Sequence, residues 1–371
     1  MTDRRGFQGF RRMLIALLLI TQGVAAEQVG NLYEAESPVT GQDAEARADG
    51  IKNAFAQVLV KVSGDRGLLT NPDLDGLLRK ASSYMQQYRY QMLDIEPGET
   101  AEGEPDRMLW VRFDERAVNR LLRESGVPVW GTTRPSVLIW LGEESGTSRS
   151  LLSLERRPKL KTLLKRTAGE RGLPILLPLM DMEDRAALPV GDLWGGFETD
   201  IRRASARYLP DVILVGRLHE RGRGNWQGEW TLYLPDKINR WSGQAGSRGA
   251  VVYEGLQQVS DALALRYAPQ QVSEGSTQLR IRIHGLNQLS NYVLVKDYLQ
   301  SLAMIEQLDL LAAGPENVSF LARIQGGRDV LERGIQLGAV LEPVIADEPV
   351  VVDGNAVPVE LEGESLDYRL R

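Results

Sequence analysis

The chain has 371 residues, 43% of them hydrophobic and 25% charged, a composition ordinary for a packed globular protein of about two to three domains. It contains no cysteine, which excludes disulfide bridges, thiolate metal sites, a cysteine nucleophile and the lipid attachment of a bacterial lipoprotein. The formal net charge of -6 argues against general binding of nucleic acid, because that binding depends on cations placed on phosphates.

Residues 1–26 have the pattern of a secretory signal peptide. Arginines precede an unbroken apolar run from Met13 to Ile20, and small residues end the segment before Glu27. The run is far shorter than the roughly 20 apolar residues that span a bilayer. We therefore expect cleavage near Ala26-Glu27 and a soluble periplasmic protein with no transmembrane segment in the mature chain.

Residues 27–132 form the first predicted domain, of α+β type. Apolar residues recur at spacings of three and four between Ala44 and Val62, which predicts one amphipathic helix that Gly64 ends. Thr40 with Asp43 suggests a loose capping box. A second helix is expected from about Pro72 to Tyr88 and a short one around residues 118–122. The expected strands are residues 32–35, 90–95 and 108–113.

The stretch from Asn71 to Gly76 imitates the first half of a calcium-binding loop. Position 12 of such a loop should supply a bidentate glutamate, but Ser82 stands there. The simpler interpretation is that Asn71 caps a helix with Pro72 in its first turn. We predict no metal and no cofactor.

Residues 133–272 form the second predicted domain, with the element order βαβαβββα. Apolar runs at 137–141, 174–180 and 212–215 alternate with helical patterns, and an antiparallel part follows through Trp226 to Leu234. This order, together with the phrase from Ala206 to Arg217 (ARYLPDVILVGR), resembles the N-terminal periplasmic domain of the translocation protein TolB and the similar domains of curli-secretion and penicillin-binding-protein activator lipoproteins. The resemblance implies a module that docks partners in the cell envelope and does not itself catalyse a reaction.

Residues 276–346 form the third predicted domain. A cleanly alternating strand at 278–284, a helix, two strands and a second helix give a βαββα order, which suggests a small ferredoxin-like sandwich. Residues 347–371 are predicted as an acidic C-terminal tail. Asp353-Gly354 either turns a hairpin within that tail or the tail is loose. The fold class is therefore a mixed α+β and α/β chain of three small modules.

Several segments together resemble the bacterial domain-of-unknown-function family 2066. They are the phrase YEAESPV from Tyr33 to Val39, LVKVSG from Leu59 to Gly64, Trp130-Gly131, and RPSVLIW from Arg134 to Trp140. This resemblance covers nearly the whole mature chain and implies no particular reaction. The three-part plan is also similar to that of flagellar assembly protein T.

Seven basic side chains crowd one predicted helix and its approach. A binding interpretation makes them a landing face for an acidic partner, such as lipid head groups, peptidoglycan carboxylates or an acidic protein, and the alternative is a solvated helix face. The residues of this predicted partner-binding face are Arg156, Arg157, Lys159, Lys161, Lys165, Arg166 and Arg171.

The sequence carries no recognisable catalytic motif. His219 and His284 are expected on the solvent side of strands. An open α/β sheet collects ligands beyond the carboxyl ends of its parallel strands, where carboxylates could act as acid and base on a glycan. The residues expected there are Glu143, Glu144, Asp181, Glu183, Asp184 and Arg217.

The leading hypothesis is a non-enzymatic periplasmic interaction or assembly protein whose partners are envelope proteins or peptidoglycan. Its candidate contact surfaces are the basic face and the cluster of Trp226, Trp230 and Trp241, although tryptophan is more often part of a core. The alternatives are a cell-wall glycan hydrolase that uses the carboxylates above, and an accessory protein of a flagellum or secretion apparatus.

Overall fold

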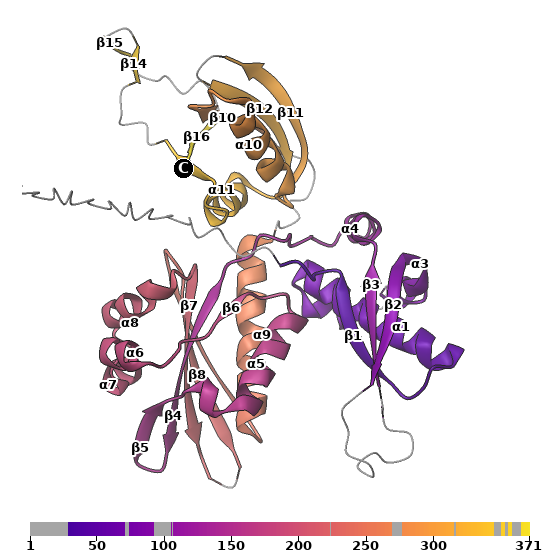
Figure 1. Ribbon diagram of the computed structural model, residues 1–371, viewed down its shortest axis with the longest axis vertical. Coiled ribbons are helices and arrows are strands. Elements are labelled where there is room, and N and C mark those ends of the chain that lie inside the picture. Colours follow the sequence, from indigo (N-terminus) through magenta and orange to yellow (C-terminus); the bar gives the residue numbers. More distant parts are fainter. Residues whose placement is uncertain are drawn as a thin grey trace, which may run out of the picture.

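The structure is a computed structural model that describes residues 29–70, 74–92, 105, 107–222, 224–268, 277–314, 317–344, 350–352, 355–357 and 365–371. Three modules, each built from helices and an antiparallel or mixed sheet, confirm the mixed fold class. Figure 1 shows the first and middle modules beside each other, with the third module beyond one end of both. The expected signal peptide and residues 71–73 of the calcium-like turn lie outside the described residues. No helix in the described ranges is long and apolar enough to cross a membrane.

The first module is a three-stranded antiparallel sheet in the order β1-β3-β2, with the long helix α1 packed against β1 and β3. The core of this module contains Phe55, Val58 and Leu109. Its elements are β1 (Glu34–Val39), α1 (Ala44–Ser63), a 3-10 turn (Arg66–Thr70), α2 (Leu74–Leu78), α3 (Ala81–Tyr84), β2 (Met85–Met92), β3 (Arg107–Phe113) and α4 (Glu115–Glu124).

The helix predicted from spacing is present as α1, and Gly64 ends it in the left-handed conformation with φ 76°. Its N-cap is Asp43 alone, whose carboxylate accepts hydrogen bonds from the backbone N–H groups of Glu45 and Ala46. The helix expected from Pro72 to Tyr88 is present only as the two short helices α2 and α3, and it ends early because residues 85–88 already belong to β2. Their backbone pairs with β3, and this pairing outweighs the local helix pattern.

The middle module has a sheet in the order β5-β4-β7-β8-β9, and β6 pairs with the beginning of β4. Helices α5 and α9 cover one face, and α6, α7 and α8 cover the other (Figure 1). Its elements are β4 (Val137–Ser145), β5 (Ser148–Leu151), a 3-10 turn (Leu154–Arg156), α5 (Pro158–Glu170), β6 (Ile175–Leu176), α6 (Met182–Ala187), α7 (Val190–Gly195), α8 (Glu198–Ser205), a 3-10 turn (Ala206–Tyr208), β7 (Val212–Glu220), β8 (Trp226–Tyr233), β9 (Ile238–Ala245) and α9 (Arg248–Tyr267).

Two features of this module differ from the predicted βαβαβββα order. The first strand continues through Glu143 and Glu144, and a tight turn with Gly146 at φ 60° returns it as β5. The strand expected at 174–180 shrinks to the two residues of β6, and α6 and α7 follow it. Each of these helices has six residues, which is too short for a helical period to show in the sequence.

Trp230 is the centre of the core beneath α9, and three glycines make room for its ring. A β-carbon added to Gly216 or Gly255 would lie 2.4 or 2.3 Å from the Trp230 ring. One added to Gly228 would lie 2.5 Å from Val251. A side chain at any of these positions would therefore displace well-packed atoms.

We expect Gly255→Ala to lower the free energy of unfolding by about 2 kcal/mol, because the new methyl group overlaps the buried indole. Gly169→Ala is the matched control, since that helical glycine in α5 has open space around an added β-carbon. The control should gain about 0.5 kcal/mol from helix propensity. Urea unfolding followed by tryptophan fluorescence measures both, and a neutral Gly255→Ala variant would contradict the packing argument.

The third module has a five-stranded sheet in the order β11-β12-β10-β16-β13. The predicted βαββα order is present, and its core includes Ile281, Val295 and Phe320. The elements are β10 (Thr277–His284), α10 (Leu289–Ser301), β11 (Ile305–Ala313), β12 (Asn317–Ile324), α11 (Arg328–Leu337), β13 (Leu341–Pro343), β14 (Val350–Val352), β15 (Asn355–Val357) and β16 (Ser365–Leu370).

The end of the predicted acidic tail is part of this sheet. Strand β16 lies between β10 and β13, parallel to β10, and buries Leu366 and Tyr368 in the core. The division at residue 347 is therefore wrong for residues 365–371. Their apolar residues alternate, and pairing with β10 and β13 turns those residues toward the core. Strands β14 and β15 form the small hairpin that was one of the two alternatives, and residues 358–364 lie outside the described residues.

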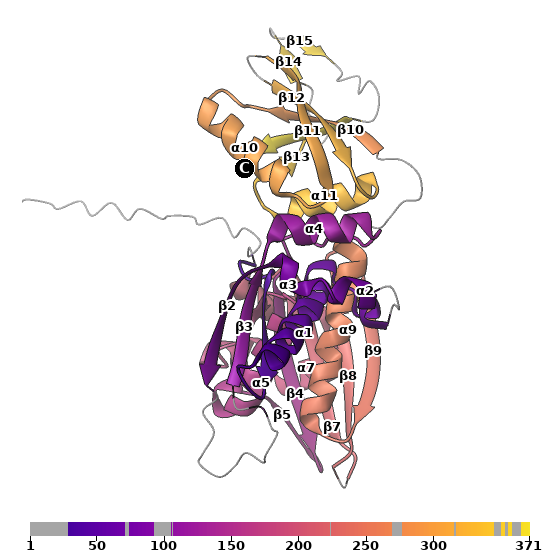
Figure 2. The same cartoon turned by 90° about the vertical axis from the view of Figure 1, so that its right-hand side faces the viewer.

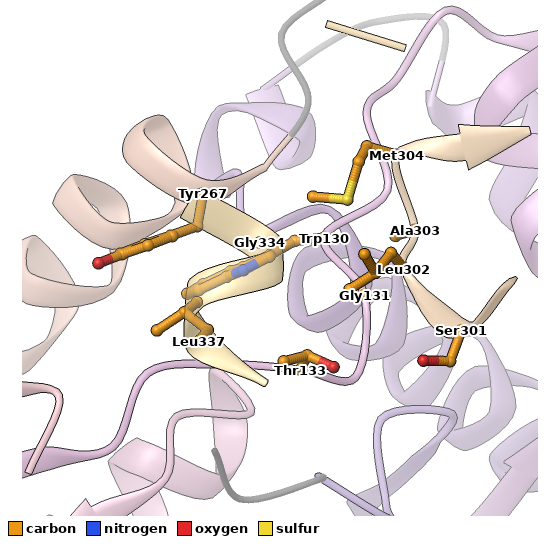
Figure 3. Close-up of a pocket in the computed structure, with 10 residues that line it drawn as sticks. All are labelled: Trp130, Gly131, Thr133, Tyr267, Ser301, Leu302, Ala303, Met304, Gly334 and Leu337. Carbon is orange, nitrogen blue, oxygen red and sulfur yellow. The ribbon is translucent and has the colours of Figure 1, made fainter. Parts of the chain in front are cut away.

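The connecting segment at Trp130 and Gly131 lies where the three modules meet. Figure 3 shows Gly131 against Ala303 of the third module, with Tyr267 of α9 nearby. A β-carbon on Gly131 would lie 2.7 Å from that of Ala303, so the close approach requires glycine. Figure 2 shows α11 beyond the end of α9, and Arg333 of α11 donates to the carbonyl of Arg266 in α9.

Candidate anion-binding site

Four arginines line a cavity of about 610 Å³ in the middle module. The cavity lies between the segment that follows β5 and the segment that runs from the end of β6 into α7. Two serines, Ser150 and Ser153, add hydroxyl groups, and Met180, Leu188 and Val190 supply apolar walls. The four arginines are Arg149, Arg156, Arg157 and Arg185.

The sheet edge explains why these side chains converge. Both β5 and β6 pair with β4 along the same edge, β6 at its beginning and β5 at its end. From β5 the chain passes to α5 on one face, whereas from β6 it passes to α6 on the other face. Arginines from the two connections therefore face each other across the edge.

Two of the four guanidinium groups are neutralised by glutamates of β4. Arg149 donates to Glu144 over 2.6 Å, and Arg157 lies 3.4 Å from Glu143, which Arg248 also contacts at 2.8 Å. The hydrogen bond from Arg149, followed by that from His219, lowers the pKa of Glu144 below its ordinary value. Glu144 therefore stays a carboxylate near neutral pH.

The other two guanidinium groups leave the cavity with excess positive charge. Arg185 donates through Nε to the carbonyl of Met180 over 3.0 Å. Among the described residues, neither Arg185 nor Arg156 has a carboxylate within ion-pair distance. Arginine forks of this kind match the geometry of carboxylate and phosphate groups. The cavity is thus suited to a compact anionic group.

The structure divides the predicted partner-binding face. Arg156 and Arg157 line the cavity, and Lys159, Lys165 and Arg166 are exposed along α5. Lys161 is bonded to Glu155, and Arg166 lies 3.6 Å from Glu170. Arg171 does not belong to the face: it is buried and donates to Gln257, Asp261 and the carbonyl of Gly64, because α9 and the first module pack over the end of α5.

Sequence reasoning missed Arg149 and Arg185. Arg149 lies in β5 before the basic run and Arg185 lies in α6 beyond β6, and nothing in their local sequence distinguishes them from ordinary surface arginines. Only the pairing of β5 and β6 along one strand edge could have indicated them.

The carboxylates proposed for glycan hydrolysis form two separate groups. Glu143 and Glu144 lie within β4, not beyond its end, and are bonded to arginines as described above. Arg207 contacts Asp181, Glu183 and Asp184 at 3.0, 3.4 and 3.0 Å. That arginine lowers the pKa of Asp181, whereas a general acid needs a raised one. Arg217, expected with them, donates to the carbonyl of Trp194 and lies 3.5 Å from Glu229.

The expectation that His219 faces solvent is wrong. It is buried beneath Trp194 of α7, which packs over Gly142 because that position has no side chain. Its Nδ1 lies 3.2 Å from Glu144 and its Nε2 3.8 Å from Glu229. His284 is half-buried and hydrogen-bonded to Asp367 of β16 over 2.8 Å.

The tryptophan cluster is largely a core feature. Trp230 is fully buried, and Trp226 and Trp241 pack partly buried against the same cluster under α9. Arg248 lies over the Trp226 ring at 5.6 Å. This arrangement leaves the arginine cavity as the stronger candidate for binding.

Comparison with known proteins adds one family match. Residues 26–131, which span the first module, match the model of a domain of unknown function (DUF8605). No curated protein matches the sequence.

Two solved structures are similar to a part of the chain. The N-terminal domain of Protein Y from Thermus thermophilus shares 9% identity at a TM-score of 0.18, over 35% of this chain and 93% of that one. The C-terminal domain of LpoB from Salmonella enterica shares 13% identity at a TM-score of 0.21, over 34% of this chain and 88% of that one. Likenesses this weak carry no conclusion about function.

Proposed function

We propose that this protein is a non-enzymatic binding protein of the bacterial periplasm, whose middle module holds a carboxylate of another envelope component in the arginine cavity. The observation that carries the proposal is the pair of guanidinium groups, Arg156 and Arg185, that face the cavity without a carboxylate partner among the described side chains. The resemblance of residues 206–217 to the partner-docking TolB-type module supports it.

The binding part is tested with citrate as a small polycarboxylate probe. Isothermal titration should give saturable binding that weakens with salt, because exposed charges are screened. The double variant Arg156→Ala, Arg185→Ala should bind at least about tenfold more weakly, since charge-assisted hydrogen bonds contribute about 1.5–3 kcal/mol. The control is Lys159→Ala, Lys165→Ala on the exposed face of α5. Equal weakening in the two double variants would refute a specific site.

The compartment is tested separately. Fractionation of cells that express the full-length chain should yield a periplasmic product whose N-terminus is Glu27. An unprocessed product among cytosolic proteins would overturn the envelope assignment. Neither the hydrolase nor the flagellar alternative gains a supporting observation in the described parts of the chain.

A further inference from the structure

Three large apolar side chains project into solvent where the segment after β6 meets the end of the 3-10 turn before β7. Leu179, Met182 and Leu209 are 61, 89 and 59% exposed. They come from two segments that are bonded to each other: the backbone N–H of Leu179 donates to the hydroxyl of Tyr208, and Arg207 donates to Asp181. We call these three residues the apolar patch.

The backbone that carries the apolar patch is strained. Among the described residues, three that are not glycine have positive φ, and two of them are here: Met180 at 57° and Leu209 at 47°. Such a conformation costs about 1–2 kcal/mol for a residue with a side chain. Strain of this kind persists only where the surroundings fix it, and it is most frequent at functional sites.

A buried carboxylate fixes both strained segments. Asp184 is fully buried and accepts hydrogen bonds from the Met180 N–H and the Tyr208 hydroxyl, each over 2.7 Å. Arg207 donates to it over 3.0 Å and also binds both oxygens of Asp181. These buried hydrogen bonds of Asp184 and Arg207 hold the backbone of the apolar patch in place, although its side chains are exposed to water.

The apolar patch and the cavity are continuous. Met180, which lies between Leu179 and Asp181, forms part of the cavity wall. Met182 and Arg185 stand three positions apart on α6, so they share one face of that helix. Apolar and cationic contacts are therefore presented side by side.

We propose that the apolar patch and the arginine cavity together bind an extended segment of a partner protein in which an acidic side chain stands next to an apolar one. This inference rests on the proposed function and names the partner's chemistry. The acidic group enters the cavity and the apolar group covers Leu179, Met182 and Leu209. A peptide fits better than an anionic membrane, because Glu183, whose side chain is 69% exposed, stands within the apolar patch and would meet the lipid phosphates.

A random peptide library displayed on phage and selected on the purified protein tests this proposal. Selected sequences should share an Asp or Glu adjacent to Leu, Ile or Phe. A synthetic peptide of the consensus should bind Met182→Ser at least about tenfold more weakly than the unchanged protein, because the variant no longer buries an apolar side chain against the peptide. Leu289→Ser is the matched control: Leu289 is 77% exposed on α10 of the third module.

The outcomes separate this inference from the proposed function. If citrate binding depends on Arg156 and Arg185 but Met182→Ser binds the peptide unchanged, the cavity stands and the docking inference fails. Selected peptides without acidic residues would also overturn it. So would muropeptides that compete for the cavity more strongly than the peptide, or binding to phosphatidylglycerol vesicles that Met182→Ser abolishes. If the unchanged protein does not bind citrate, both the proposed function and the docking inference fail.

Discussion

Replacing Arg134 with Met is expected to lower the free energy of unfolding by at least about 4 kcal/mol, since several buried carbonyls lose their donor and each such loss costs about 1–3 kcal/mol. Arg134 has no exposed surface. Its guanidinium donates to five backbone carbonyls, those of Lys61, Trp130, Gly131, Arg171 and Gly172, at 2.7–3.1 Å. The side chain therefore saturates its five donors without a carboxylate.

Those carbonyls come from three parts of the chain, so Arg134 joins modules. Lys61 belongs to α1 of the first module, and Arg171 and Gly172 follow α5 of the middle module. The guanidinium also lies over the Trp130 ring at 4.1 Å. Burial lowers the pKa of Arg134, but five carbonyl oxygens replace the water that a cation requires. Methionine would leave all five acceptors without a donor.

Urea unfolding of the Arg134→Met variant should show an earlier transition that splits in two, because the first and middle modules lose a buried polar connection. Arg134→Lys should rescue little, as an ammonium group has only three donors and no planar fork. The control Arg203→Met removes an arginine whose side chain is 65% exposed, and it should change stability by less than about 0.5 kcal/mol. A single transition within 1 kcal/mol of the unchanged protein would contradict the argument.

Local periodicity predicted the elements whose residues face one core. The spacing in α1 and the alternation in β10 both follow directly from burial on one side. The same reasoning failed where the tertiary fold reassigns a residue. Arg171 ends a basic run and reads as solvated, yet Asp261 and Gln257 of α9 enclose it. Strand β16 reads as a tail, because its neighbour β10 lies about eighty residues away in the sequence.

The candidate site was predictable only in part. The sequence indicated Arg156 and Arg157 because they begin a basic run. Arg149 and Arg185 reach the same cavity only because β5 and β6 pair with one edge of β4. The apolar patch gave no signal, since single exposed leucines are normal on a surface. What distinguishes Leu179 and Leu209 is the strained backbone and buried Asp184 beside them, and neither feature can be read from residue order.

Lys61 should make the protein more stable as the pH rises from about 8 to about 10. This lysine is buried, its ammonium donating to the carbonyls of Glu34 over 2.7 Å and Asn31 over 3.4 Å. Burial first, and then the charge of Arg134, lower its pKa from 10.5 to about 8. Between these two values the unfolded chain holds a proton that the folded chain has released, so the free energy of unfolding rises with pH.

The full effect of Lys61 is about 3 kcal/mol, from about 1.4 kcal/mol per pKa unit. Below pH 8 both states are protonated and the destabilisation is constant. Tyr33 acts in the opposite direction: burial raises its pKa to about 12, so the folded state loses stability once the unfolded tyrosine ionises above its ordinary value of 10.0. Stability should therefore peak near pH 10.

Urea unfolding at pH 8, 9 and 10 measures this rise, and Lys61→Met provides the test. The variant lacks the buried ammonium whose pKa differs between the folded and unfolded chain in that window, so its free energy of unfolding should rise much less between pH 8 and pH 10. An exposed lysine on α1, Lys52, serves as the control, and Lys52→Met should retain the rise. If Lys61→Met keeps the same slope, another group carries the pH dependence, and the buried ammonium of Lys61 is not its source.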